Sequence, residues 1–132
     1  MIVLDCSALV PTLTSRATDA HLLRARIAEA TTVFAPTLLD YEIQSALLGM
    51  ERGGKLTEHQ VAKAIGDYRQ LPLTRHDTLP FFDRVRTLRQ NLSVYDAQYV
   101  ALAEVLGTPL VTCDARIARS GAAKCPVEVF AA

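Results

Sequence analysis

The sequence predicts an α/β fold, a parallel sheet of four or five strands flanked by helices on both faces. Short apolar runs alternate along the chain with longer segments of helical spacing, the pattern of parallel strands joined by crossover helices. The first run, Ile2-Val3-Leu4, is apolar without interruption, as expected of a strand covered on both faces. With 132 residues, half of them hydrophobic, the chain is expected to form a single domain, 1–132.

The elements after this first strand follow from capping residues and apolar spacing. Ser7 is expected to cap a short helix that runs to about Leu13. A second helix is expected over residues 18–30, whose leucine and isoleucine side chains share one side. A short second strand is expected over residues 33–35, because Pro36 follows the apolar run directly.

The helix expected from Thr37 to about Arg52 carries a functional signal. Thr37 and Asp40 have the spacing of a capping box, and two glycines after Arg52 mark the end of the helix. Glu42 lies in the apolar stripe of this helix, three residues after Leu39. A carboxylate on a buried helix face is costly unless it is paired. We therefore interpret Glu42 as a candidate site residue, with an ion pair to a core arginine as the alternative.

The rest of the chain continues the same alternation. Thr57 and Gln60 have capping-box spacing at the start of the next helix. Ser93 precedes a segment that is apolar on nearly every side, which predicts a buried helix. The expected ranges are helices at 57–70, 78–91, 93–106 and 114–120, and strands at 72–74, 109–112 and 127–130.

Composition excludes several classes of protein. A charged fraction of 21% beside a hydrophobic fraction of 50% excludes a disordered chain. No apolar run approaches the roughly 20 residues that span a bilayer, and the first residues lack the features of an export signal. The three cysteines show no metal-binding spacing, so we expect reduced thiols and a cytoplasmic location. The formal net charge of zero gives no argument for nucleic-acid binding.

Four acidic residues occupy positions where open α/β sheets bind ligands. Asp5 and Asp114 each follow a short apolar strand, whereas Glu42 and Asp96 lie near the starts of helices that are predicted to be buried. Taken singly, Asp5 and Asp114 are equally well explained as helix caps, and Asp96 as part of a capping box with Ser93. Taken together, four carboxylates repel one another unless a cation is present. Oxygen-only ligands favour Mg²⁺ or Mn²⁺, so we predict a divalent metal site.

Four segments of the chain resemble PIN domains, most closely the ribonuclease toxins of the VapC type from bacterial toxin–antitoxin pairs. The segments are IVLDCSALV (2–10), LLDYEIQSALL (38–48), LSVYDAQYVALAE (92–104) and PLVTCDARIAR (109–119). In that family the acids of the site fall on Asp5, Glu42 and Asp96, with Asp114 as a more variable fourth. The small hydroxyl residues beside the site correspond to Ser7 and Thr112.

The resemblance implies a PIN fold and an endoribonuclease that hydrolyses RNA phosphodiester bonds with water activated by Mg²⁺ or Mn²⁺. Asp5 and Asp96 are expected to be the principal metal ligands, and Glu42 and Asp114 to complete the shell or orient the attacking water. Arg116 is a weaker candidate for a contact to an RNA phosphate, with simple solvent exposure as its alternative. The resemblance further implies a homodimer and a cognate antitoxin of the VapB type.

Other functions stay open at this point. One is a catalytically idle PIN-like scaffold that binds protein or RNA, and another is a different metal-dependent, phosphate-handling α/β enzyme. Enzymes with an aspartyl nucleophile carry a second acid two residues after the first, where this chain has Ser7. A metal-free ribonuclease needs paired histidines, but His21, His59 and His76 lie in three separate polar segments. The RNA target is not indicated by the sequence.

Overall fold

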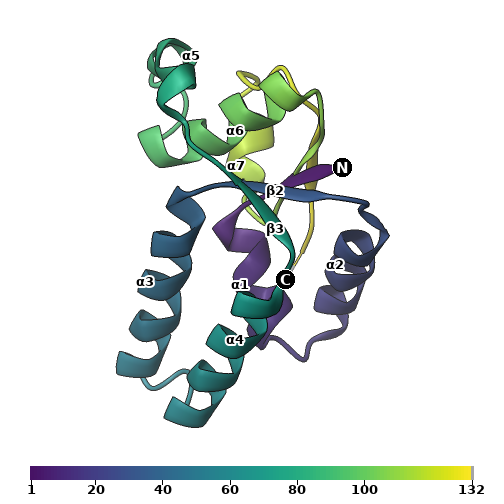
Figure 1. The fold of residues 1–132 in the computed structure, drawn as a ribbon, viewed down its shortest axis with the longest axis vertical. Helices are drawn as coiled ribbons and strands as arrows, with labels where there is room; N and C mark the ends of the chain where they lie inside the picture. The colour runs from purple at the N-terminus through teal and green to yellow at the C-terminus, as the bar shows by residue number, and fades with distance from the viewer. Residues whose placement is uncertain (132) are drawn as a thin grey trace.

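The computed structural model describes residues 1–131 and shows a parallel sheet between two layers of helices (Figure 1). The sheet has five strands in the order β3-β2-β1-β4-β5, and every neighbouring pair is parallel. The predicted fold class is therefore confirmed. The strands are β1 (Ile2–Leu4), β2 (Val33–Pro36), β3 (Leu73–His76), β4 (Leu110–Thr112) and β5 (Val127–Val129).

The helices divide between the two faces of the sheet. In Figure 1, α1 to α4 lie on one side of the strands, and α5 to α7 lie on the other. The first group comprises α1 (Cys6–Thr14), α2 (Thr18–Glu29), α3 (Leu38–Arg52) and α4 (Glu58–Gln70). The second group comprises the 3₁₀ turn η1 (Leu79–Phe81), α5 (Phe82–Leu88), α6 (Val94–Leu106) and α7 (Ala115–Arg119).

The strand order reverses direction between β1 and β4. Strands β2 and β3 extend the sheet on one side of β1, whereas β4 and β5 extend it on the other. At such a reversal the connections leave the carboxyl ends of the two strands toward opposite faces, which opens a crevice between them. Asp5 directly follows β1, and Asp114 is the second residue after the end of β4. The topology therefore positions both of these acids at the edge of the sheet where ligands bind.

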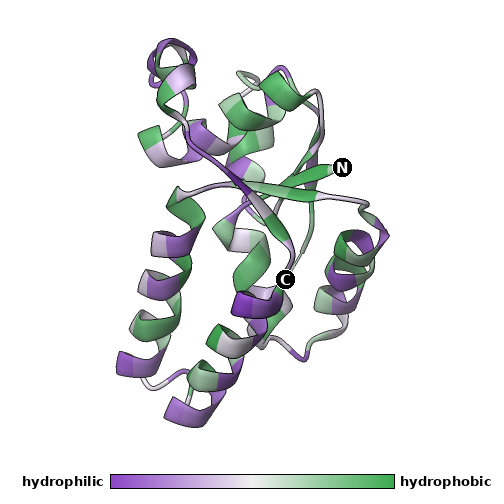
Figure 2. Ribbon diagram, viewed as in Figure 1, coloured by the Kyte–Doolittle hydropathy of each residue, from purple (hydrophilic) through white to green (hydrophobic). Residues whose placement is uncertain are grey.

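The buried core explains why the strands and α6 form as they do. All three residues of β1 and all three of β4 are buried. On α6 the residues from Tyr99 to Ala103 are consecutively buried, as its nearly continuous apolar sequence predicts. Figure 2 shows apolar residues along the central strands, while α3 and α4 alternate between apolar and polar positions. Burial on both faces accounts for the unbroken apolar runs in the strands.

Some of the expected helix caps form and others do not. The Thr57–Gln60 capping box at α4 is confirmed, with both reciprocal hydrogen bonds formed. At α1 the cap is Asp5 and not Ser7, because the Ser7 hydroxyl is engaged elsewhere. At α3 the Thr37 hydroxyl donates to the His76 carbonyl, so no capping box forms.

Several predicted boundaries also shift. The single helix expected over 78–91 is divided into η1 and α5, with Pro80 inside the 3₁₀ turn. Proline lacks the N–H that an α-helical hydrogen bond requires, which favours a separate short turn at this point. Ser93 caps α6 by accepting from the Asp96 N–H at 3.1 Å, so this half of the proposed capping box is present.

Within residues 1–131, no helix combines the length and the apolar character needed to cross a membrane.

Candidate active site

Asp5 is the most constrained acid of the predicted site. Only 5% of it is exposed, at the carboxyl end of the central strand β1. Its Oδ1 accepts hydrogen bonds from the Ser7 hydroxyl at 2.8 Å and from the Ala8 N–H at 3.0 Å. Its Oδ2 accepts from the Thr112 hydroxyl at 2.5 Å. The side chain is thus fixed both by its own helix cap and by the neighbouring strand β4.

Ser7 and Thr112 connect the two strand ends. Their hydroxyl oxygens lie 3.0 Å apart, although the residues are 105 positions apart in the chain. The Ser7 hydroxyl also accepts the N–H of Cys113 at 2.9 Å, and the Thr112 hydroxyl accepts the N–H of Asp114 at 2.9 Å. The two hydroxyl residues predicted to support the site therefore lie next to the Asp5 carboxylate and tie β1 to the turn after β4.

The environment of Asp5 disfavours its charged form. Burial is the largest influence and, despite the hydrogen bonds from Thr112, Ser7 and Ala8, raises the pKa of Asp5 to about 6. The nearby carboxylate of Asp96 raises it further. Within residues 1–131, the groups that donate hydrogen bonds to the Asp5 carboxylate are all neutral. A cation near this carboxylate would favour the charged form and relieve the electrostatic cost of burial.

Glu42 reaches the same region from α3 and is linked to α6. It is half-buried, and one of its carboxylate oxygens accepts a hydrogen bond from the Tyr99 hydroxyl. Burial raises the pKa of Glu42, the Tyr99 hydrogen bond opposes that rise, and the charge of Asp96 adds to it. The partner of Glu42 is therefore a phenol, not the core arginine considered as an alternative.

Tyr99 is the residue of this site that sequence reasoning missed. Its position on the apolar helix α6 predicted a core side chain, and it is indeed almost fully buried. A buried tyrosine, however, usually needs a hydrogen-bond partner for its hydroxyl. That requirement was the available signal, but only the folded chain shows that Glu42 is the acceptor.

Asp96 contributes the third charge from the first turn of α6. Its carboxylate raises the pKa of both Asp5 and Glu42, so the three acids lie within electrostatic range of one another. The N-terminal turn of a helix is a favourable position for a negative charge. No donor within residues 1–131 forms a hydrogen bond to the Asp96 side-chain oxygens, which leaves them available to a ligand. We refer to Asp5, Glu42 and Asp96 as the acidic cluster.

Asp114 differs from these three acids. It caps α7 by accepting the Arg116 N–H at 3.0 Å, and its carboxylate forms an ion pair with the Arg116 guanidinium at 2.7 Å. These interactions with Arg116 lower the pKa of Asp114. Asp114 therefore lies at the predicted strand end, but its charge is already compensated. Arg116 is largely exposed, as the alternative for that residue anticipated.

The donor chemistry of the acidic cluster fits a hard divalent cation. Carboxylate oxygens are the ligand type that Mg²⁺ and Mn²⁺ take. Within residues 1–131 none of the three carboxylates forms an ion pair, although the charge of Asp96 acts on the Arg116 guanidinium. Over residues 1–131, no three histidine, cysteine, aspartate or glutamate side chains are close enough to form a ready coordination shell. The three acids of the cluster therefore affect one another electrostatically, but their side chains do not already form a metal coordination shell. The metal site stays a prediction.

The cysteines and histidines have no comparable arrangement. Cys6 and Cys113 are free thiols beside the cluster, and burial raises their pKa to about 12 and about 11. His21 and His59 are exposed, and His76 packs against the Phe34 ring at a centroid distance of 5.5 Å. No paired histidine base and acid is found among the described residues.

Comparisons with known proteins agree with this architecture. The sequence matches the family model described as PIN domain over residues 2–122. It is 37% identical over 129 residues to VapC ribonuclease Mb0985 of Mycobacterium bovis, covering 98% of each chain. It is 40% identical over 119 residues to ribonuclease VapC3 of Mycobacterium tuberculosis, covering 90% of this chain and 86% of that one. A crystal structure of VapBC2 from Rickettsia felis, bound to a DNA fragment from its promoter, superposes with a TM-score of 0.68 at 14% identity and covers 98% of this chain and 99% of its own.

Proposed function

The chain belongs to the PIN domain family, and from this premise we propose that it is an endoribonuclease that requires Mg²⁺ or Mn²⁺. The observation that carries the proposal is the acidic cluster at the reversal of the strand order. Asp5 is buried there with no cationic partner among residues 1–131, and the charge of Asp96 acts on both Asp5 and Glu42. Relatives that are 37–40% identical are named VapC ribonucleases, which supports RNA as the substrate.

In the proposed site each acid has a defined task. Asp5 and Asp96 are the principal ligands, Asp5 held rigidly by Ser7 and Thr112, and Asp96 presented by the first turn of α6. Glu42, fixed by the Tyr99 hydroxyl, completes the shell or orients the attacking water. A bound divalent ion lowers the pKa of a coordinated water and stabilises negative charge on a phosphoryl oxygen.

The residues after β4 act at the periphery of this site. Asp114 is the fourth acid of the proposed shell, but the Arg116 guanidinium neutralises it here. We therefore assign it a smaller effect on metal affinity than the other three acids. In this proposal the exposed Arg116 side chain pairs with an RNA phosphate, in exchange for part of its contact with Asp114.

We further propose that the protein is the toxin of a toxin–antitoxin pair. Its curated relatives carry VapC names, and a solved structure with the same fold is a VapBC complex on promoter DNA. The proposed partner is a VapB-type antitoxin whose cationic side chain neutralises the acidic cluster. A homodimer of the toxin is part of the same proposal.

Digestion of total cellular RNA in Mn²⁺ tests the proposed activity. The wild-type protein is expected to generate new RNA ends with 5′-phosphates, and chelation with EDTA is expected to abolish them. Asp5→Asn removes a proposed ligand and is expected to be inactive, whereas Asp67→Asn, at an exposed acid on α4 outside the site, serves as the matched control. Cleavage in EDTA, or by Asp5→Asn at the wild-type rate, would refute metal-dependent catalysis by the acidic cluster. Binding without cleavage under every condition would favour the scaffold alternative.

A further inference from the structure

We propose that Arg116 is an exchangeable counter-ion beside the acidic cluster. Its guanidinium holds the Asp114 carboxylate in the free protein and releases it to the divalent cation when an RNA phosphate binds the guanidinium instead. RNA and the metal ion thereby strengthen each other's binding. The inference rests on the proposed function for the metal and the RNA, and adds how the binding of one is coupled to the binding of the other.

The Arg116 guanidinium engages both oxygens of the Asp114 carboxylate. Its Nε donates to Oδ1 at 3.0 Å, and its Nη2 donates to Oδ2 at 2.7 Å. Oδ1 also accepts the backbone N–H of Arg116 at 3.0 Å. A metal ion that binds Asp114 must therefore displace the guanidinium from at least one of these oxygens. Arg116 and the metal ion are competitors for the same carboxylate.

The backbone around Asp114 is already tied to the acidic cluster. The Asp114 N–H donates to the Thr112 hydroxyl at 2.9 Å, and the same hydroxyl donates to the Asp5 carboxylate at 2.5 Å. One threonine thus fixes both the main chain of Asp114 and the side chain of Asp5. The difference between Asp114 and the three acids of the cluster is therefore its cationic partner and not its position in the fold.

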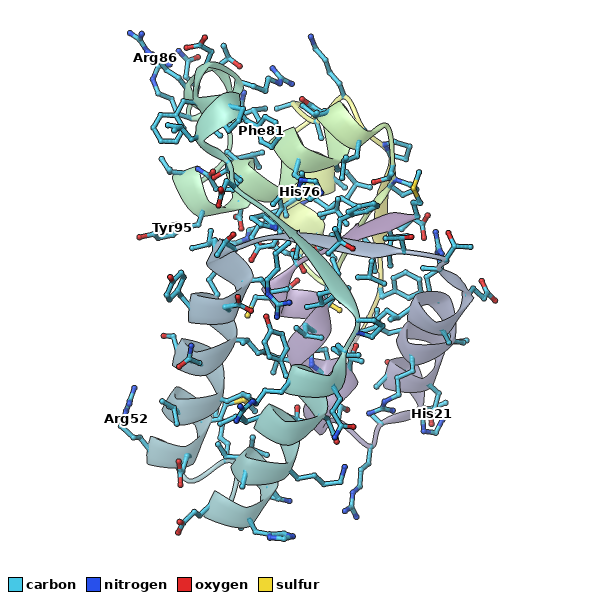
Figure 3. The ribbon with its side chains drawn as sticks, viewed as in Figure 1. His21, Arg52, His76, Phe81, Arg86 and Tyr95 are labelled. Carbon is cyan, nitrogen blue, oxygen red and sulfur yellow. The ribbon has the colours of Figure 1, made fainter. Side chains whose placement is uncertain are left out.

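A hollow beside the first turn of α6 places Arg116 next to Asp96. Its volume is about 210 Å³, and its wall includes Asp96 from α6 and Arg116 and Ile117 from α7. Figure 3 shows the side chain of Tyr95 extending outward from the start of α6. Because successive residues of an α-helix project about 100° apart, Asp96 points in another direction, into the hollow that Arg116 also lines. The charge of Asp96 acts on Arg116 there, so one guanidinium faces two of the proposed metal ligands.

The ion pair between Arg116 and Asp114 can be exchanged at low cost. The Arg116 side chain is 77% exposed, and within residues 1–131 its guanidinium has no acceptor other than Asp114. An exposed ion pair contributes little net stability, because water screens the charges and ordering the side chain costs entropy. A phosphate offers the guanidinium an equivalent bidentate partner. Transfer of Arg116 to a phosphate therefore frees Asp114, and reciprocity requires the metal ion to favour RNA binding by the same factor.

Binding of Mn²⁺ to the RNA-free protein measures the competition without any catalysis. Electron paramagnetic resonance of the unbound Mn²⁺ gives the dissociation constant. Arg116→Gln removes the guanidinium but keeps the backbone N–H that Asp114 accepts, and it is expected to bind Mn²⁺ roughly 5-fold more tightly than the wild type, a small coupling because the ion pair is exposed. Arg119→Gln is the matched control. It removes an equal charge from an exposed position of α7 that, within residues 1–131, donates no hydrogen bond to Asp114, and it is expected to bind within about 2-fold of the wild type.

Cleavage of total cellular RNA at varied Mn²⁺ concentration tests the release by RNA. Wild type and Arg116→Gln are expected to need the same Mn²⁺ concentration for the half-maximal rate, because bound RNA has already withdrawn Arg116 from Asp114 in the wild type. Arg116→Gln is expected to need roughly 5-fold more RNA than the wild type, since it lacks the phosphate contact. If Arg116→Gln again needs 5-fold less Mn²⁺ than the wild type during cleavage, release of Asp114 by RNA is overturned.

A double-mutant cycle assigns the effect to the ion pair. Asp114→Asn removes the carboxylate for which the two cations compete, so adding Arg116→Gln to it should leave the Mn²⁺ dissociation constant unchanged. The proposal is overturned by equal Mn²⁺ affinities of wild type and Arg116→Gln, by an equal gain in Arg119→Gln, or by an undiminished gain in the Asp114→Asn background.

Failure of this proposal is distinguishable from failure of the proposed function. Absence of Mn²⁺ binding in both wild type and Arg116→Gln would refute the metal site itself, and the exchange with it. Mn²⁺ binding that is lost in Asp5→Asn but is the same in wild type and Arg116→Gln would refute the exchange alone.

Discussion

Replacing Asp5 by asparagine is expected to stabilise the metal-free protein at neutral pH. Burial raises the pKa of Asp5 in the folded state to about 6, against a reference value of 3.8. Between these values the folded state binds more protons than the unfolded state, so the free energy of unfolding decreases as the pH rises through this window. At about 1.4 kcal/mol for each pH unit, the charged Asp5 costs about 3 kcal/mol at pH 7.5. Asparagine carries no charge and avoids this cost.

Part of this gain is offset by the hydrogen bonds around the side chain. An asparagine amide places a donor where one carboxylate oxygen accepts from Ser7 or from Thr112. Those hydroxyls can reorient, and the loss of one neutral hydrogen bond costs about 1 kcal/mol. The net expectation for Asp5→Asn is therefore an increase of about 2 kcal/mol in the free energy of unfolding at pH 7.5.

Urea unfolding followed by far-ultraviolet circular dichroism, in EDTA at pH 7.5 and pH 4, measures this effect. The gain is expected at pH 7.5 and should disappear near pH 4, where Asp5 is protonated in the folded wild type. Asp114→Asn is the matched control, because Arg116 lowers the pKa of Asp114 and that carboxylate stabilises the fold above its unfolded pKa. This control should lose stability at pH 7.5. An Asp5→Asn variant that is destabilised equally at both pH values would refute the burial argument and reduce Asp5 to a helix cap.

Three further predictions concern the same region. Mn²⁺ at about 100 times its dissociation constant should raise the free energy of unfolding of the wild type by roughly 2.7 kcal/mol. Thermal melts measure this stabilisation, and Asp5→Asn should show none. Equal stabilisation of both proteins would contradict a metal site at the cluster. Tyr99→Phe removes the hydrogen bond that lowers the pKa of Glu42, so the acidic limb of the pH–rate profile for RNA cleavage should move to higher pH. If the acidic limb does not move, Glu42 does not titrate in the reaction. Because burial raises the pKa of the Cys6 and Cys113 thiols, intact-mass analysis should show slow alkylation by iodoacetamide at pH 7.5 in the folded protein and rapid alkylation in urea. Alkylation of these thiols at the same rate with and without urea would disprove their protection.

The features that the sequence predicted correctly are those set by local pattern and topology. The unbroken apolar run at β1 predicts a strand buried on both faces, and the alternation of strands with helices predicts the parallel sheet. Because ligands bind at the carboxyl ends of such strands, the position of Asp5 follows directly. The Thr57–Gln60 capping box also depends only on neighbouring residues, and it is confirmed.

The features that were missed depend on contacts between distant residues. Ser7 does not cap α1, because its hydroxyl contacts Asp5 and Thr112, and Thr112 lies 105 positions away. Asp40 does not form a capping box with Thr37, because its carboxylate pairs with Arg75 and accepts from the Tyr68 hydroxyl. Spacing along the chain carries no information about such partners.

Within the candidate site, spacing along the chain also does not show which carboxylates are paired with a cationic side chain. The sequence placed Asp5 and Asp114 at equivalent strand ends, which gave no reason to distinguish them. In the folded chain Asp114 is paired with Arg116, whereas Asp5 is buried with neutral donors. The pairing of Glu42 with Tyr99 likewise requires α3 and α6 to meet, which no local pattern encodes.

The most direct test of the acidic cluster is an anomalous difference map from crystals of the protein soaked in MnCl₂. A metal site formed by these residues predicts a Mn²⁺ peak bounded by the carboxylate oxygens of Asp5, Glu42 and Asp96, and the loss of that peak in Asp5→Asn crystals grown under the same conditions. A peak elsewhere, or an empty cluster in well-diffracting crystals of the wild type, would contradict a metal-dependent mechanism at this site.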